Sequence, residues 1–164
     1  MVKIFVKDYG VMSFEMDYSA AKNTATNFVE LARKGYYDGL TFHRIIEGFM
    51  IQGGDNKKGG PGYSIKGEFA SNGIKNPLRH DRGVISMART MYKDSASAQF
   101  FIMHKKAPHL DGEYAAFGKM IEGEEVLDKI ASVKTDYFDA PLEDVIIEKV
   151  EVIDEPVSES IKIR

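Results

Sequence analysis

The sequence predicts a mainly β protein of one domain with two helices, in which the strands form a sandwich or a barrel. The length of 164 residues is close to the commonest size of a single domain, and 43% hydrophobic with 29% charged residues is typical of a globular chain. Many short apolar runs are interrupted by glycine, which favours short strands. Two other segments repeat their apolar residues at helical spacing.

The first predicted element is a β-hairpin. Val2, Ile4 and Val6 alternate with the other residues of the opening segment, and Asp8-Tyr9-Gly10 has the composition of a turn.

The first helix is predicted over residues 21–34. Gly35 stands where a C-terminal cap belongs, and Ser19 and Asn23 are both candidate N-caps. The apolar residues at helical spacing are Ala25, Phe28, Leu31 and Ala32.

Further strands are predicted in five apolar runs, a second helix at residues 124–131 and a last strand at 145–153. We expect a domain at residues 1–154 and a polar, frayed tail at 155–164. The five runs are residues 40–46, 49–52, 83–88, 100–103 and 115–121.

Composition and charge exclude several classes of function. A net charge of −3 offers no basic surplus for phosphates, so we expect no nucleic-acid partner. The chain has no cysteine, which excludes thiol chemistry and cysteine-based zinc sites. Because neither a signal-like start nor a run of membrane-spanning length is visible, we expect a cytoplasmic protein that does not contact membranes.

Three common motifs fail. The glycine-rich segment 53–62 lacks the Lys-Ser/Thr pair of a phosphate-binding loop, and no G-x-S-x-G elbow is present. We expect no metal and no other cofactor, because the histidines lie at no metal-ligand spacing. They are His43, His80, His104 and His109.

One segment places a permanent cation among apolar residues. Strict alternation would put Phe42, Arg44 and Ile46 on one face of a strand. Arg44 could form an ion pair, or rest its stem on apolar surface with a solvated tip. A third possibility is that Arg44 borders a binding pocket with apolar walls and with glutamines at its rim. Each aromatic residue of such a pocket, taken singly, is more often part of the hydrophobic core. The residues that could form this pocket are Phe49, Met50, Phe101 and Leu110, with Gln52 and Gln99.

The chain resembles the cyclophilins over about residues 1–153. The resemblance rests on FHRIIEGFMIQGGD (42–55), GVISMAR (83–89), AQFFI (98–102), and HLDG with FGK (109–112 and 117–119). It implies a closed eight-stranded antiparallel β-barrel capped by two α-helices. It also implies a cofactor-free isomerase that rotates peptide bonds preceding proline and so assists protein folding.

The resemblance assigns roles position by position. Arg44 matches the family's catalytic arginine, and Gln52 and Phe49 belong to the same catalytic group. Arg89 is expected to act mainly through its main chain, and His43 to be structural. The expected substrate-binding positions are Met50, Ala88, Arg89, Thr90, Gln99, Phe101, His109, Leu110 and Tyr114.

Three positions depart from many eukaryotic members of the family. His109 replaces a tryptophan, Tyr114 a histidine and Arg89 an asparagine, and the first two changes resemble bacterial variants. Loss of the indole at position 109 predicts weakened binding of cyclosporin-type inhibitors with isomerase activity kept.

The expected partners are proline-containing peptides and unfolded or partly folded chains, bound by a monomer. Two alternatives stay open: a non-catalytic module that grips proline peptides, and a ligand-carrying or structural barrel in which Arg44 forms a salt bridge.

Overall fold

The structure is a computed structural model that describes all 164 residues. The two α-helices are α1 (Lys22–Arg33) and α2 (Glu124–Ala131), and neither has the length and apolar character needed to cross a membrane. Two short 3-10 helices lie at Ala70–Asn72 and Pro108–Leu110. The eight strands are β1 (Val2–Val6), β2 (Gly10–Met16), β3 (Phe42–Ile46), β4 (Met50–Gly53), β5 (Val84–Met87), β6 (Phe100–Met103), β7 (Ala116–Glu122) and β8 (Ile147–Val152).

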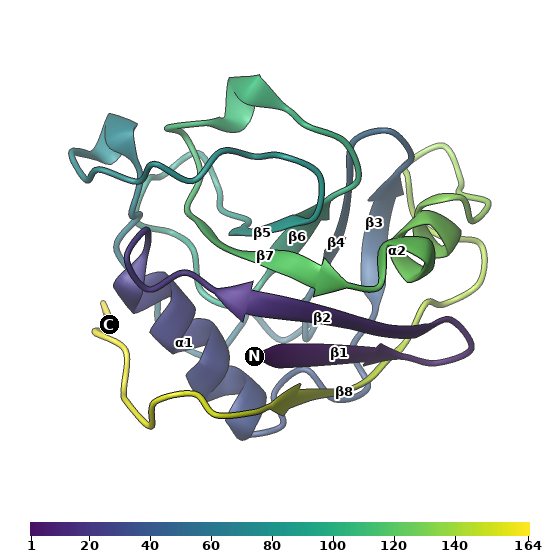
Figure 1. The fold of residues 1–164 in the computed structure, drawn as a ribbon, viewed down its shortest axis with the longest axis horizontal. Helices are drawn as coiled ribbons and strands as arrows, with labels where there is room; N and C mark the ends of the chain where they lie inside the picture. The colour runs from purple at the N-terminus through teal and green to yellow at the C-terminus, as the bar shows by residue number, and fades with distance from the viewer.

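The strands form one curled antiparallel sheet in the order β3-β4-β6-β5-β7-β2-β1-β8 (Figure 1). The mainly β class with eight antiparallel strands and two helices is therefore confirmed. The predicted closure is wrong, because β3 and β8 form no ladder, and only the residues just before them, Thr41 and Ile146, form an isolated bridge.

A segment remote in sequence lies along the open seam. Beyond this bridge the backbone N–H of Ile45 donates to the carbonyl of Asp139 at 2.8 Å, so the segment before β8 covers the edge of β3. A covered edge leaves no row of unpaired groups that a second strand could extend.

Helix α1 ends as the sequence predicts. Gly35 adopts the left-handed conformation with φ +73°. The N–H of Gly35 donates to the carbonyl of Ala32, and the N–H of Tyr36 donates to that of Leu31. This pair of bonds is the Schellman arrangement that ends many helices.

The start of α1 differs from the prediction. Neither Ser19 nor Asn23 caps it, and Ala21 occupies the cap position without a side-chain bond. The carboxylate of Glu68 instead accepts the backbone N–H of Thr24 at 2.6 Å and that of Asn23 at 3.3 Å. A negative charge there satisfies free helix donors and suits the helix dipole.

Two apolar clusters lie on opposite faces of the sheet. The larger contains 31 buried residues and includes Phe28 of α1 with Phe100 of β6. The smaller contains seven and includes Phe101, the next residue along β6. Because alternate side chains of a strand point to opposite faces, β6 contributes apolar residues to both clusters.

The tail after residue 154 was expected to be frayed, but it is ordered against the domain. It runs beside α1 (Figure 1), where the buried Ser160 donates its backbone N–H to Glu30 at 2.9 Å. Ile163 forms an antiparallel bridge with Ser64. The tail is therefore bonded to the domain at several points.

Candidate active site

An irregularity in β3 determines which face of the sheet Arg44 lies on. Phe42 pairs with Gly53 and Arg44 with Gln52, so β3 advances by two residues where β4 advances by one. The extra residue, His43, is a β-bulge, which resets the alternation of the strand.

The bulge corrects the predicted face. Phe42 and Ile45 belong to the main core, whereas Arg44 is exposed and Ile46 packs against the smaller cluster. Phe42 therefore does not share a face with Arg44. Burial lowers the pKa of His43, and its Nδ1 has no hydrogen-bond partner.

Arg44 borders an apolar cavity of about 220 Å³ built on the smaller cluster. The walls come from β3, β4 and β6, from the residues that follow β5 and from the segment before β7. The nine lining residues are Arg44, Phe49, Met50, Gln52, Ala88, Arg89, Phe101, Leu110 and Tyr114.

Ring contacts fix the cavity walls. The ring of Phe101 meets Tyr114 edge-on at 5.7 Å between centroids and stacks on the buried His80 at 5.9 Å. Phe49 stacks with His109 at 5.9 Å. Aromatic pairs at such distances stabilise one another beyond their area burial, so the walls are held before any ligand binds.

The guanidinium of Arg44 keeps its donors available. Arg44 takes part in none of the ion pairs of the structure. Its nearest polar contact is Nη1 to Oε1 of Gln52, at a long 3.5 Å. Gln52 in turn donates from Nε2 to Oε1 of Gln99 at 3.0 Å. The salt-bridge alternative for Arg44 is therefore wrong, and three polar side chains line up along one rim.

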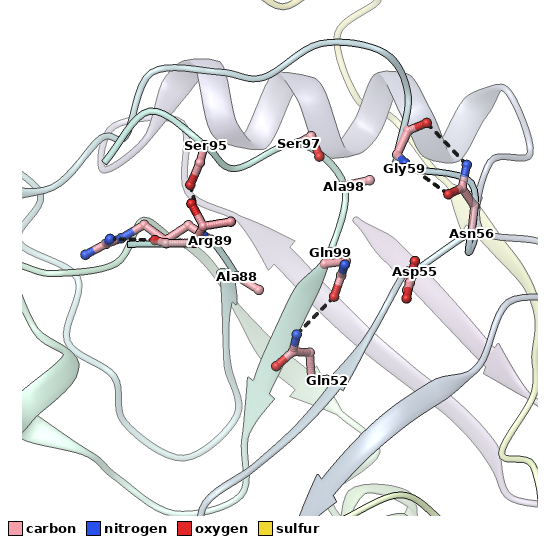
Figure 2. Close-up of a pocket in the computed structure, with 13 residues that line it drawn as sticks. Gln52, Asp55, Asn56, Gly59, Ala88, Arg89, Ser95, Ser97, Ala98 and Gln99 are labelled. Atoms are coloured by element: carbon pink, nitrogen blue, oxygen red, sulfur yellow. Dashed lines mark hydrogen bonds between the residues drawn. The ribbon is translucent and has the colours of Figure 1, made fainter. Parts of the chain in front are cut away.

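A second, polar chamber of about 340 Å³ (Figure 2) shares lining residues with the apolar one. Gln52, Ala88 and Arg89 line both chambers. Two of the predicted positions, Thr90 and Gln99, line only the polar one.

Sequence reasoning missed part of the polar chamber. Asp55, Asn56, Ser95 and Ser97 line it, and none of them was among the predicted site residues. No sequence motif marks these positions; in the structure Asn56 accepts the N–H of Gly60 at 3.1 Å and donates to its carbonyl at 3.3 Å, which closes this loop.

Arg89 was expected to act mainly through its main chain, but its side chain also makes contacts that support the cavity. Its guanidinium lies between the rings of Phe69 and Tyr114, at 4.9 and 4.7 Å from their centroids. It also donates to the carbonyl of Glu113 at 2.7 Å and is 11% exposed. Arg89 therefore supports the wall formed by Tyr114 from behind.

A buried polar chain lies beneath Phe101. His80 donates from Nδ1 to Asp111 at 3.0 Å, and its Nε2 accepts the hydroxyl of Ser86 at 2.8 Å. Burial lowers the pKa of His80 although Asp111 opposes this, so the ring is neutral. The residue types are those of a hydrolase triad. Ser86 is fully buried, however, and no substrate can reach it.

The structure thus brings most of the predicted site residues together. His109 lines neither chamber and lies exposed on the outer side of Phe49. The arrangement can hold a compact apolar ring while a guanidinium and an amide meet the polar groups attached to it.

The comparisons with known proteins agree with one another. Residues 1–152 match the family described as cyclophilin type peptidyl-prolyl cis-trans isomerase/CLD. The chain is 46% identical over 121 residues to peptidyl-prolyl cis-trans isomerase B of Bacillus subtilis, covering 72% of this chain and 81% of that protein. It is 41% identical to peptidyl-prolyl cis-trans isomerase-like 2 of Rhizopus delemar, covering 94% of this chain but only 29% of that protein. The chain spans less than a third of the fungal relatives of this type that it matches.

A solved structure extends the likeness to three dimensions. A Cryptosporidium parvum cyclophilin type peptidyl-prolyl cis-trans isomerase, crystallised in the presence of the dipeptide Ala-Pro, superposes with a TM-score of 0.84. The two sequences are 34% identical, and the match covers 94% of this chain and 99% of that one.

Proposed function

The chain belongs to the cyclophilin type peptidyl-prolyl cis-trans isomerase family, and from this premise we propose that it accelerates rotation about peptide bonds that precede proline. The observation that carries the proposal is the unpaired guanidinium of Arg44 at the rim of an apolar cavity of about 220 Å³.

The proline ring of the substrate occupies this apolar cavity in our proposal. Phe49, Met50 and Phe101 contact the ring, and Gln52 contacts the backbone beside it. The residues before proline then extend towards the polar chamber, which shares Gln52 and Ala88 with the ring cavity. A relative crystallised in the presence of Ala-Pro supports this class of ligand.

The energetics require no nucleophile. Amide resonance produces a rotation barrier of about 18–20 kcal/mol, and uncatalysed isomerisation takes roughly 10–100 s. A turnover time of about a millisecond requires the barrier to fall by on the order of 6 kcal/mol. No covalent bond is made or broken, so selective stabilisation of the twisted state suffices.

Arg44 supplies this selectivity in our proposal. In the twisted transition state the prolyl nitrogen loses conjugation and gains a basic lone pair, to which a guanidinium N–H can donate. The planar ground state has no such acceptor, so the bond lowers the barrier instead of merely tightening binding. A charge-assisted bond in a water-poor site contributes about 2–3 kcal/mol. Transfer of the amide out of water contributes the remainder.

The wider setting follows the same premise. We propose unfolded and partly folded chains as the physiological partners, since these expose peptide bonds before proline. The cytoplasmic location and the monomeric state stay predictions from the sequence.

An isomerisation assay on a short Ala-Pro peptide, protease-coupled or by exchange NMR, tests the proposal. The unchanged protein should accelerate the exchange. Arg44→Ala should keep the fold and much of the peptide affinity while lowering kcat/KM about 100-fold, through loss of roughly 2.7 kcal/mol of transition-state stabilisation. Arg44→Lys should also fail, because an ammonium lacks the planar fork.

The matched control is Arg79→Ala, which removes an exposed arginine outside both chambers and should leave the rate unchanged. Near-normal exchange by the Arg44→Ala variant would refute the role of Arg44. No acceleration by the unchanged protein would favour a structural or non-catalytic module.

A further inference from the structure

The turn between β3 and β4 presents Phe49 to the proline cavity. The N–H of Phe49 donates to the carbonyl of Ile46 at 3.0 Å, and Gly48 has φ +81° whereas Glu47 does not have a positive φ. These features define a type II β-turn. Its central peptide, between Glu47 and Gly48, would have the opposite orientation in a type I turn.

His104 holds this peptide in one orientation. The imidazole is 10% exposed, and its Nδ1 accepts the N–H of Gly48 at 2.8 Å. The backbone N–H of His104 also donates to the carbonyl of Phe49 at 2.9 Å. One residue therefore bonds the turn on both sides of the Gly48–Phe49 peptide.

The opposite side of the imidazole is fixed by α2. Nε2 lies 2.9 Å from Oδ1 of Asp128, and Asp128 accepts two bonds from Arg82 at 2.9 and 3.1 Å. Hydrogen bonding to Arg82 lowers the pKa of Asp128, so the carboxylate is charged and accepts the Nε2 proton. Since a backbone N–H can only donate, Nδ1 of His104 is unprotonated and the ring is a neutral acceptor.

We propose that His104 is a positioning residue of the isomerase: as a neutral acceptor anchored to α2, it selects the type II form of the 46–49 turn and thereby sets the position of Phe49 in the proline cavity. The effect on KM rests on the proposed function of that cavity. The effect on the turn does not.

Two substitutions separate the two bonds of the imidazole. In His104→Asn the amide oxygen, attached to Cγ like Nδ1, can still accept the Gly48 N–H, but the side chain is too short to reach Asp128. In His104→Gln the amide reaches towards Asp128 and leaves Gly48 without an acceptor. We expect KM for an Ala-Pro peptide to stay within about twofold in the Asn variant and to rise about fivefold in the Gln variant, the effect of one ordinary hydrogen bond.

Stability provides the contrasting readout. The Gln variant should have the larger free energy of unfolding in urea, because it keeps the link to α2, while the Asn variant should have the lower KM. A merely structural role would rank the variants alike in both measurements, and that outcome would overturn the proposal.

Hydrogen exchange of the Gly48 backbone amide tests the effect on the turn directly and needs no substrate. Protection of this amide should be kept in the Asn variant and lost in the Gln variant. Equal protection in the two variants contradicts the proposal, whatever the outcome of the Arg44 experiment.

Discussion

At the scale of single residues, the bulge at His43 lets β3 carry the charged Arg44 although its neighbours Phe42 and Ile45 are buried. Phe42 is fully buried in the main core, and in a regular strand Arg44 would point the same way. An unpaired charge in that core would be very costly. The bulge at His43 lets Phe42 and Ile45 face the core while Arg44 turns to the cavity.

His109 is the residue on which we base the prediction about inhibitors. It stacks on the outer side of Phe49 and is exposed. His109→Trp would add aromatic area and an indole N–H at this rim, so we expect the affinity for cyclosporin to rise about tenfold, or about 1.4 kcal/mol, with isomerase activity unchanged. Calorimetric titration of both proteins measures the difference.

His109→Phe is the matched control, because it adds aromatic area without the N–H donor and should yield a smaller gain. Unchanged cyclosporin affinity in the Trp variant would show that position 109 does not limit inhibitor binding.

At the scale of elements, the buried carboxylate of Glu30 is one of several α1 groups that bond the C-terminal tail. Burial by itself raises the pKa of Glu30, but bonds from the Ser160 N–H, Lys162 and Lys34 lower it from 4.5 to about 2. Lys162 approaches Glu30 to 2.9 Å. Residues 160–162 of the tail therefore provide hydrogen bonds and a positive charge to the carboxylate of Glu30, which would otherwise be buried with fewer partners.

This carboxylate should make stability depend on acid. Because the pKa is lower in the folded state, the contribution of Glu30 is complete above about pH 4.5 and is lost as the pH falls towards 2. The shift corresponds to about 3 kcal/mol. Glu30→Gln should lower the free energy of unfolding at pH 6 and make it less dependent on pH below 4.5, as measured by urea denaturation.

Glu159→Gln is the matched control, since Glu159 is an exposed tail carboxylate with no hydrogen-bond partner. It should leave both the stability at pH 6 and its dependence on pH unchanged. An equal effect of the two substitutions would mean that Glu30 does not anchor the tail.

At the scale of the whole molecule, the sheet separates the main core on one face from the apolar cavity on the other. Phe100 packs in the main core against Phe28, Tyr37 and Phe42, with ring centroids 5.3–5.9 Å apart. Phe101 lies on the other face and lines the cavity. The adjacent residues Phe100 and Phe101 of β6 thus contribute to the main core and to the cavity wall, respectively.

Truncating each of these neighbours should separate stability from activity. Phe100→Ala should lower the free energy of unfolding by about 3–5 kcal/mol, with KM little changed at temperatures where the protein stays folded. Phe101→Ala should cost less stability but raise KM and lower kcat, because it opens the cavity that we propose for the proline ring. Urea denaturation and the peptide assay measure the two effects, and an equal loss of activity in both variants would argue against the division of faces.

The sequence by itself determined the elements and most of the candidate site. Helix α2 lies at the residues predicted, and α1 differs by one residue at each end, because periodic burial and the Gly35 cap are local properties. The resemblance in segments 42–55 and 98–102 placed Arg44 and Phe101, which the structure brings to one cavity.

Only the tertiary structure decided how distant residues combine. The bulge at His43, the open seam covered by Asp139, the cap of α1 by Glu68 and the anchoring of the tail at Glu30 all depend on partners that are remote or on a neighbouring strand. Such contacts form where the folded backbone satisfies polar groups that would otherwise be buried without a partner. Local periodicity carries no information about which remote group will satisfy them, so the sequence predicted the parts and the fold selected their partners.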